Sequence, residues 1–255
     1  DIASPGDYDV TVTNPVPVAG PSGKLTFRVD PASLAISTAS PLPAGTTGVT
    51  YTTTVAASGG TLPYSWSLSS GALPTGLSLT PATGVISGIP IAGIAPASFQ
   101  IRVTDNAGAH TEKDLSLSIY NPAPIISSLS PSSKTAGEAG FPLTVYGTGF
   151  INGSIVRVNA SDRTTEFVSS TQLTATILTG DIASAGNLSV TVFTGIPGGG
   201  SSDPPATLTV NPVGLAITTS TPLPGGVVGT VYSTTLGASG GTPPYSWSLA
   251  SGTWP

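Results

Sequence analysis

The sequence predicts an all-β protein made of β-sandwiches connected in series, and three observations predict it. Gly (32) and Pro (25) residues are abundant, which favours many turns and few helices. Several short stretches alternate apolar and polar residues, the period of a strand with one buried face. Two parts of the chain also repeat, since Leu34–Pro74 aligns without a gap with Leu215–Pro255, and Asp1–Val12 aligns with Asp181–Val192.

The repeats give a unit of roughly 180 residues that holds two different modules. Solenoid units of roughly 20 to 50 residues stack into one core, so a unit of this length predicts whole domains in series. The chain begins at the point equivalent to Asp181 and stops at the point equivalent to Pro74. We therefore expect two complete modules with a partial module at each end. A half sandwich exposes its inner face, so a longer polypeptide or neighbouring chains would complete it.

Four strands follow from the alternation of apolar residues, two near the N-terminus and two in the first complete module. We expect them at residues 8–12, 25–29, 99–104 and 114–119. The last two are joined by Asp-Asn-Ala-Gly-Ala-His (residues 105–110), which predicts a hairpin-like loop. Short strands at this spacing are typical of sandwiches.

The composition excludes several classes of function. Charged residues make up 7% of the chain and the net charge is -5, so there is no basic stripe for phosphates and no nucleic-acid partner is expected. Cys and Met are both absent, which suits an extracellular protein exposed to oxidation. No stretch of about 18 apolar residues predicts a membrane span. Because so few charges hydrate the surface, we expect either attached glycans or sheet edges used for strand addition between subunits.

Two families are resembled at specific motifs. Gly59–Leu68, Leu73–Leu79, Thr83–Pro90 and Val103–Asp105 resemble the He_PIG (cadherin-like) immunoglobulin-like modules of large bacterial surface proteins. Ile125–Pro131, Ala136-Gly137, Leu143–Phe150 and Leu188–Val192 resemble the IPT/TIG immunoglobulin-like domain. The resemblance implies tandem immunoglobulin-like β-sandwiches in an extended array. Its boundaries are 1–31 (C-terminal part of a TIG-like domain), 32–122 (He_PIG-like), 123–212 (TIG-like) and 213–255 (N-terminal part of a second He_PIG-like domain).

Two pairs of aromatic residues, Tyr64 with Trp66 and Tyr245 with Trp247, could stack on a carbohydrate or belong to the core. Tyr64 and Trp66 alternate with serines and so share one strand face, and a large aromatic on a central strand usually anchors an immunoglobulin-like core. We therefore predict core positions for all four.

No catalytic, cofactor-binding or metal-binding site is predicted. The only histidine, His110, lies in the predicted loop without the Gly-x-Ser-x-Gly elbow that a hydrolase of the Ser-His-Asp type would need. Asp105, Asn106, Glu112 and Asp114 carry oxygen ligands that suit calcium. However, the spaced acidic motifs of cadherin interfaces are missing, so calcium is not expected here.

Three Asn-x-Ser sequons, at Asn152, Asn159 and Asn187, are candidates for N-glycosylation. Asn159 is predicted to share a solvent-facing strand face with Arg157, opposite Val156 and Val158. The null alternative is an unmodified surface asparagine, and no sequon has the acidic residue two positions earlier that the extended bacterial sequon requires. Sugar linked to Ser and Thr hydroxyls is an equal alternative.

These observations lead to three functional hypotheses. The first is a non-enzymatic extracellular structural protein, such as a stalk, an adhesin shaft or a filament subunit, which self-associates into a fibre or continues a longer chain. The second is a module that binds a carbohydrate or a protein. The third is an accessory region of a secreted polysaccharide-active enzyme. Fold analogy carries part of this ranking, and fold alone does not fix function.

Overall fold

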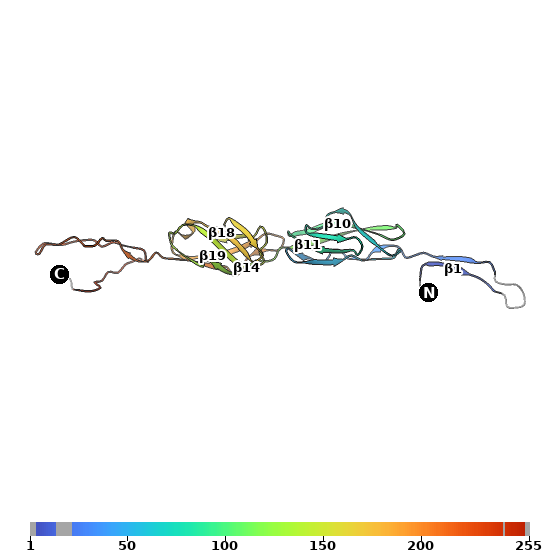
Figure 1. The fold of residues 1–255 in the computed structure, drawn as a ribbon, viewed down its shortest axis with the longest axis horizontal. Coiled ribbons are helices and arrows are strands. Elements are labelled where there is room, and N and C mark those ends of the chain that lie inside the picture. Colours follow the sequence, from blue (N-terminus) through green and yellow to red (C-terminus); the bar gives the residue numbers. More distant parts are fainter. Residues whose placement is uncertain (1–3, 14–21, 242, 253–255) are drawn as a thin grey trace. The chain divides into compact units, whose positions relative to one another are not determined.

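The structure, a computed structural model, describes residues 4–13, 22–241 and 243–252 (Figure 1). It is all-β: the described residues form strands β1 to β23, and the 3-10 turn η1 (Thr179–Ile182) is the one helical element among them. The chain divides between Asn121 and Pro122 into two compact units, which are described separately below. No helix among the described residues is long and apolar enough to cross a membrane.

The first unit begins with a hairpin. Strand β1 (Gly6–Val10) pairs antiparallel with β2 (Leu25–Val29), and Tyr8 lies opposite Phe27. Both strands fall where the alternation predicts them, although β1 ends two residues before Val12. Their apolar side chains are exposed, because the described residues of this unit place no second sheet against the hairpin.

Residues 32–121 fold into a β-sandwich. The first sheet has the order β4, β11, β10, β7, and these strands span Gly45–Thr46, His110–Tyr120, Ile94–Thr104 and Ser65–Gly71. The second layer contains the order β5, β9, β8 with Tyr51–Thr54, Val85–Gly88 and Leu77–Thr80, and the pair β3 (Ala35–Ile36) with β6 (Ala57–Ser58). β10 and β11 form the long central hairpin of this sandwich.

The core of this sandwich uses the predicted alternation. The buried residues of β10 and β11 are Phe99, Ile101, Val103, Leu115, Leu117 and Ile119. They pack with Ile36, Tyr51, Val55, Trp66 and Ile86. The two strands with period two were therefore predicted correctly. Leu68, expected on the same face as Trp66, is 38% exposed, because β10 shifts register against β7 between Gln100 and Ile101.

The second unit contains another β-sandwich. One sheet has the order β12, β14, β18, β17, which span Ile125–Ser130, Phe141–Thr148, Gln172–Ile177 and Thr165–Ser169. The other has the order β13, β21, β19, β15, β16, which span Ser133–Thr135, Ala206–Asn211, Gly186–Thr194, Ile155–Val158 and Ser161–Asp162. The short β20 (Gly200–Ser201) pairs with β19. The core includes Leu143, Val145, Leu173, Val190 and Leu208.

Residues 213–252 repeat the local structure of the start of the first sandwich. β22 (Ala216–Ile217) pairs with β23 (Ala238–Ser239) in the register of β3 with β6. The Tyr245 hydroxyl donates to the Gly240 carbonyl, as the Tyr64 hydroxyl does to Gly59. Both glycines have positive φ (72° and 77°), a conformation that glycine adopts at little cost.

The longer strands of the first sandwich have no counterparts in residues 213–252. In the complete copy, β7 pairs with β10 and β5 pairs with β9, so both depend on residues later in the module. As a consequence Trp247 is 45% exposed, whereas its counterpart Trp66 is 5% exposed. The predicted core position of Trp247 is therefore wrong in this structure, because no strand equivalent to β10 covers it.

Candidate functional site

The predicted cation ligands are engaged in separate structural bonds. Asp105 is buried, and its Oδ1 accepts hydrogen bonds from the backbone N–H groups of Ala107 (3.0 Å) and Ala109 (2.8 Å). Its Oδ2 accepts one from the Thr61 N–H at 2.8 Å. Oxygens that face N–H donors are turned away from any cation ligation. Asp105 is instead the joint between two loops of the sandwich.

The other candidates of this group lie on the surface. Glu112 pairs with Arg102, and Asp114 accepts a hydrogen bond from Gln100 at 3.1 Å, both across the β10–β11 hairpin. The backbone N–H of Asn106 donates to the Thr61 carbonyl at 2.8 Å. Within the described ranges, His, Asp and Glu residues form no cluster of three or more that could hold a metal. The geometry therefore gathers no site here.

His110 is exposed, and it is the first residue of β11 rather than a loop residue, paired with Thr104 of β10. The hairpin is shorter at its turn than the sequence predicts, because residues 105–109 already close it through the Asp105 carboxylate. The histidine side chain therefore stands at the end of the hairpin, on a sheet edge position.

The four aromatics fall into different environments. Trp66 lies in the core, and a Cβ added at Gly84 would come within 2.9 Å of its Nε1. Tyr64 is partly buried against the same core. Tyr245 is also partly buried, whereas Trp247 is exposed as described above. Tyr64 and Trp66 therefore present no flat exposed platform for a sugar.

Among the core tyrosines, Tyr51 was missed by sequence reasoning. Its hydroxyl donates to the Pro43 carbonyl at 2.9 Å. Burial raises the pKa of Tyr51, and a hydrogen bond with Thr53 opposes this in part. The residue is a structural anchor of the sandwich.

All three sequon asparagines are exposed. Asn152 lies in the loop before β15, and Asn187 lies on β19 opposite Thr209. Asn159 is not on a strand face as predicted. It follows the end of β15 and forms a two-residue turn with Ala160, both with positive φ (49° and 66°), the type of turn that hairpins favour.

The Asn159 side chain has a structural role in addition to its exposure. Its Oδ1 accepts a hydrogen bond from the Ser189 N–H at 3.0 Å, and its own N–H donates to the Ser189 carbonyl at 2.8 Å. Asparagine tolerates this left-handed conformation better than most residues. Local backbone geometry therefore accounts for an asparagine here independently of any glycan.

One ion pair of the second unit was missed because its residues lie 18 positions apart with no local pattern. Arg163 and Asp181 are 10% and 13% exposed at their side chains. Arg163 Nε donates to Asp181 Oδ2 at 2.8 Å, and Nη2 donates to Oδ1. Burial alone would raise the pKa of Asp181, but the hydrogen bonds from Arg163 and the Leu178 N–H, with the Arg163 charge, outweigh it and lower the pKa. The pair closes the sandwich beside η1.

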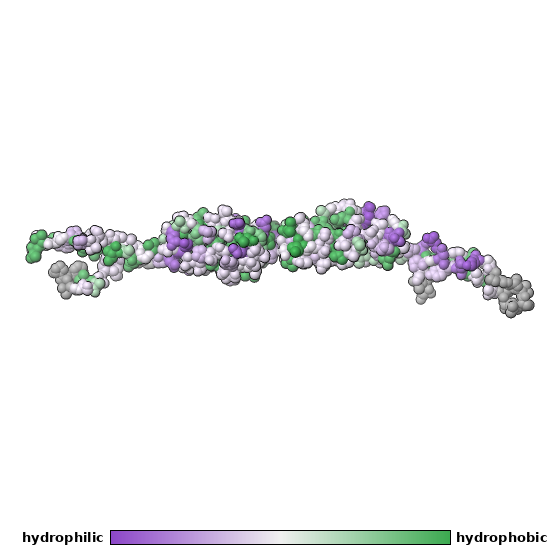
Figure 2. Space-filling view, in the orientation of Figure 1, coloured by the Kyte–Doolittle hydropathy of each residue, from purple (hydrophilic) through white to green (hydrophobic). Residues whose placement is uncertain are grey.

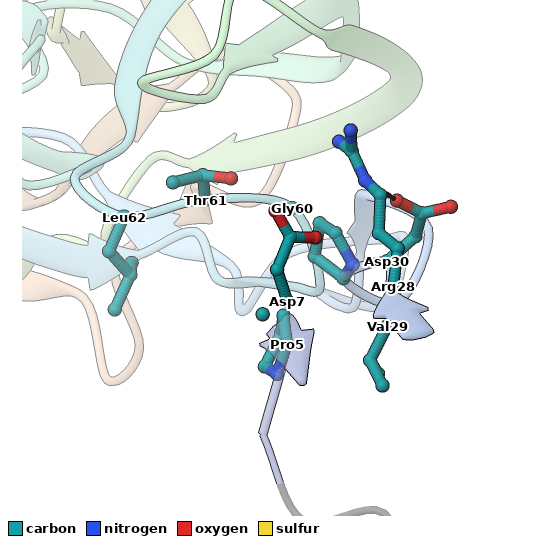
Figure 3. A pocket seen from close by; sticks show the side chains of 10 residues that line it. Pro5, Asp7, Arg28, Val29, Asp30, Gly60, Thr61 and Leu62 are labelled. Atoms are coloured by element: carbon teal, nitrogen blue, oxygen red, sulfur yellow. Dashed lines mark hydrogen bonds and ion pairs between the residues drawn. The ribbon is translucent and has the colours of Figure 1, made fainter. Parts of the chain in front are cut away.

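A pocket of about 570 Å³ lies in the first unit, between the base of the hairpin and the loop at residues 60–62 (Figure 3). Figure 3 shows Asp7, Arg28 and Asp30 on the hairpin side. Arg28 pairs with Asp30 at 2.8 Å, and both side chains are 75% exposed. Exposed ion pairs contribute little binding energy, so this pocket is not assigned a ligand.

The two sandwiches define a protein of tandem immunoglobulin-like domains. Comparison with protein families names each domain. The family described as "Putative Ig domain" (He_PIG) matches residues 32–120, and the IPT/TIG domain family matches residues 124–210. The chain therefore contains a He_PIG domain followed by an IPT/TIG domain, as the motifs indicated. A search of curated protein sequences found no match.

Solved structures of other multi-domain proteins are similar at low identity. The extracellular cadherin domains 1–4 of protocadherin gamma B7 match with 16% identity and a TM-score of 0.33, covering 82% of this chain and 65% of that one. This chain thus spans slightly less than two thirds of that structure. Titin domains I67–I69 match with 12% identity and a TM-score of 0.34, covering 76% and 71%. Drosophila OTK extracellular domains 3–5 match with 15% identity and a TM-score of 0.30, covering 73% and 68%.

Proposed function

We propose that this chain is an extracellular structural protein, a stalk, an adhesin shaft or a filament subunit, in which IPT/TIG and He_PIG domains alternate and no domain performs chemistry. The observation that carries the proposal is the recurrence of module order. A He_PIG domain is followed by an IPT/TIG domain, and then β22 and β23 repeat the register of β3 and β6. Serial repetition of whole domains is an economical way to build length.

The environment of the charged side chains supports the proposal. Arg102, Lys134, Arg157 and Arg163 each pair with a carboxylate of the same sandwich. Lys113 donates to the backbone carbonyl of Thr38 at 2.7 Å. Catalytic groups are typically titratable side chains gathered in a cleft with strongly shifted pKa values. Here the charges hold strands and loops together instead.

The surface also suits an extracellular location. Figure 2 shows that most of the visible surface of the two sandwiches is pale, with residues of intermediate hydropathy, and that strongly hydrophilic residues form separate spots. Neutral hydroxyl side chains account for this surface, since charged residues make up only 7% of the chain. Glycans at the exposed sequons Asn152, Asn159 and Asn187 would add hydration that the charges do not supply.

Small-angle X-ray scattering of the full chain tests the proposal. Domains in series would add about 40 Å each to the maximum dimension, because each sandwich is about 10 to 12 strand residues long at about 3.3 Å per residue. A radius of gyration near the roughly 18 Å of a compact globule of 255 residues would contradict a spacer function. A specific glycan-array signal that is lost on loop substitution would instead favour a binding module.

A further inference from the structure

The hairpin β1–β2 is a copy of the strand pair β19–β21. In the hairpin, Gly6, Tyr8 and Val10 lie opposite Val29, Phe27 and Leu25. In the IPT/TIG domain, Gly186, Leu188 and Val190 lie opposite Val210, Leu208 and Ala206. The two pairs therefore have the same register, and an apolar residue occupies each equivalent position.

The same positions differ in burial. Val190 and Leu208 are 0% exposed in the IPT/TIG core, whereas Val10 and Phe27 are 59% and 51% exposed. Val12, at the position of the buried Val192, is 73% exposed. A two-stranded hairpin with one apolar face is at best marginally stable in water by itself. The face of Tyr8, Val10, Val12, Leu25 and Phe27, called the inner face below, is thus a surface that lacks its cover.

The complete domain shows what covers this face. The buried residues of β19 and β21 pack against β14 and β18 of the facing sheet, through Leu143, Val145, Leu173 and Ile177. Two edge strands add backbone pairing: β15 pairs with β19, and β13 pairs with β21. All of these strands lie between Pro122 and Ile182, before β19 in the sequence.

Strand length gives a second, independent sign of a missing partner. β19 continues to Thr194, and Val156 and Ile155 of β15 pair with its residues Val192 and Phe193. β1 ends at Val10, the position equivalent to Val190. The hairpin strand therefore stops close to where pairing with an equivalent of β15 would be needed to continue it.

We propose that the inner face of the β1–β2 hairpin is an interaction surface for one partner, a polypeptide segment of the type of residues 123–180, which supplies the facing sheet and both edge strands of an IPT/TIG sandwich. The C-terminal residues 213–252 of a second copy do not fit this surface. They repeat the start of the He_PIG module, so they lack the equivalents of β14 and β18. The inference concerns the hairpin alone and is independent of the proposed function.

The experiment uses the full chain and an extended form in which residues 123–180 are repeated directly before Asp1, which aligns with Asp181. Hydrogen exchange is measured by mass spectrometry. In the extended form we expect amide exchange of residues 6–10 and 25–29 to slow by roughly a hundredfold or more, because these amides then open only with the whole sandwich. We also expect protection to extend to residues 11–13, as in β19. A control extension of equal length, residues 32–89, should leave the hairpin unprotected.

Two variants of the extended form separate specific packing from general stabilisation. Val10→Asp places a charge on the inner face and should abolish the protection. Thr11→Asp makes the same charge change on the opposite face and should preserve it. The residues of the original IPT/TIG domain serve as an internal standard of folding in every sample.

Three results would overturn the inference. The hairpin amides could exchange equally fast in the original and extended chains, or the control extension could protect them as well. Alternatively, the unextended chain could protect the same amides in a concentration-dependent way, with loss on Val10→Asp. That last result would assign the inner face to a second copy of this chain.

Discussion

The carboxylate of Asp105 accepts a hydrogen bond from the backbone N–H of Thr61 at 2.8 Å, across 44 positions of sequence. Together with its bonds to Ala107 and Ala109, this contact fixes the end of the β10–β11 hairpin to the loop before β7. Because Asp105 is buried, each of these N–H groups would lose its acceptor if the carboxylate were removed.

We expect Asp105→Ala to destabilise the He_PIG domain by about 2 to 4 kcal/mol, since three backbone donors would be left unsatisfied. Asp105→Asn should cost less, because its amide oxygen can still accept. The free energy of opening is measured from amide exchange in β10 and β11. Asp114→Ala, which truncates an exposed carboxylate on the same hairpin, is the control, and an equal effect of both substitutions would refute the role of Asp105.

Equivalent tryptophans should respond differently to truncation. Trp66→Ala should cost about 3 to 5 kcal/mol, because the side chain lies in a packed core. Trp247→Ala should change stability by less than about 0.5 kcal/mol, because its side chain is largely solvated in this structure. Differential scanning calorimetry of the two variants tests this pair. A large loss for Trp247→Ala would mean that residues 213–252 already have a cover in solution.

The sequence predicted the local and periodic parts of this structure well. Phe99, Ile101 and Val103 could be assigned to a core face because alternation is a property of the strand itself. The pairing of β22 with β23 forms without the rest of its module for the same reason. Burial of Trp247 could not be predicted from its neighbours, because it depends on a strand that lies later in the complete module.

The candidate sites were less predictable from sequence. Asp105 was considered as a cation ligand, and its role as an acceptor for backbone donors depends on a loop 44 residues away. The pair of Arg163 and Asp181 leaves no signature in the sequence, since its partners meet only when η1 packs against the sheet. Asn159 was placed on a strand by extrapolating the alternation one residue past the turn.

The buried ion pair makes the IPT/TIG domain sensitive to acid. The folded-state pKa of Asp181 is lowered, so its contribution is fully present above the unfolded-state pKa of about 3.9 and is lost as the pH falls through the lower folded-state pKa. Hydrogen bonds from Lys134 and Thr135 also lower the pKa of the exposed Glu138, so the wild-type profile contains more than one group. The difference between wild type and variant isolates Asp181.

At neutral pH we expect Asp181→Ala to cost about 3 kcal/mol, because it leaves the Arg163 charge buried without its partner. Asp181→Asn should flatten the acid dependence. Urea unfolding followed by the amide NMR signals of β14 and β18 reports this domain alone. If Asp181→Asn lost stability below pH 4 as steeply as wild type, the acid sensitivity would have to come from other carboxylates.

The sequon at Asn159 allows glycan and backbone effects to be separated. Ser161→Ala removes the sequon but retains Asn159, so it should abolish any glycan there without loss of stability. Asn159→Ala should cost about 1 kcal/mol even in an unglycosylated protein, because it removes the bond to Ser189 and a residue suited to positive φ. Peptide mapping by mass spectrometry and thermal unfolding test both variants. Equal stabilities of the two unglycosylated variants would contradict the structural role.

A residue-resolved hydrogen-exchange map of the unmodified chain tests the central claim most directly, namely that two self-sufficient immunoglobulin-like sandwiches are flanked by segments that lack their cover. We expect slow exchange in β10, β11, β14 and β19, limited by separate opening of the two domains, and fast exchange in β1, β2 and residues 223–236. Uniform slow exchange along the whole chain would contradict this account, because the flanking segments would then already be part of complete folded domains.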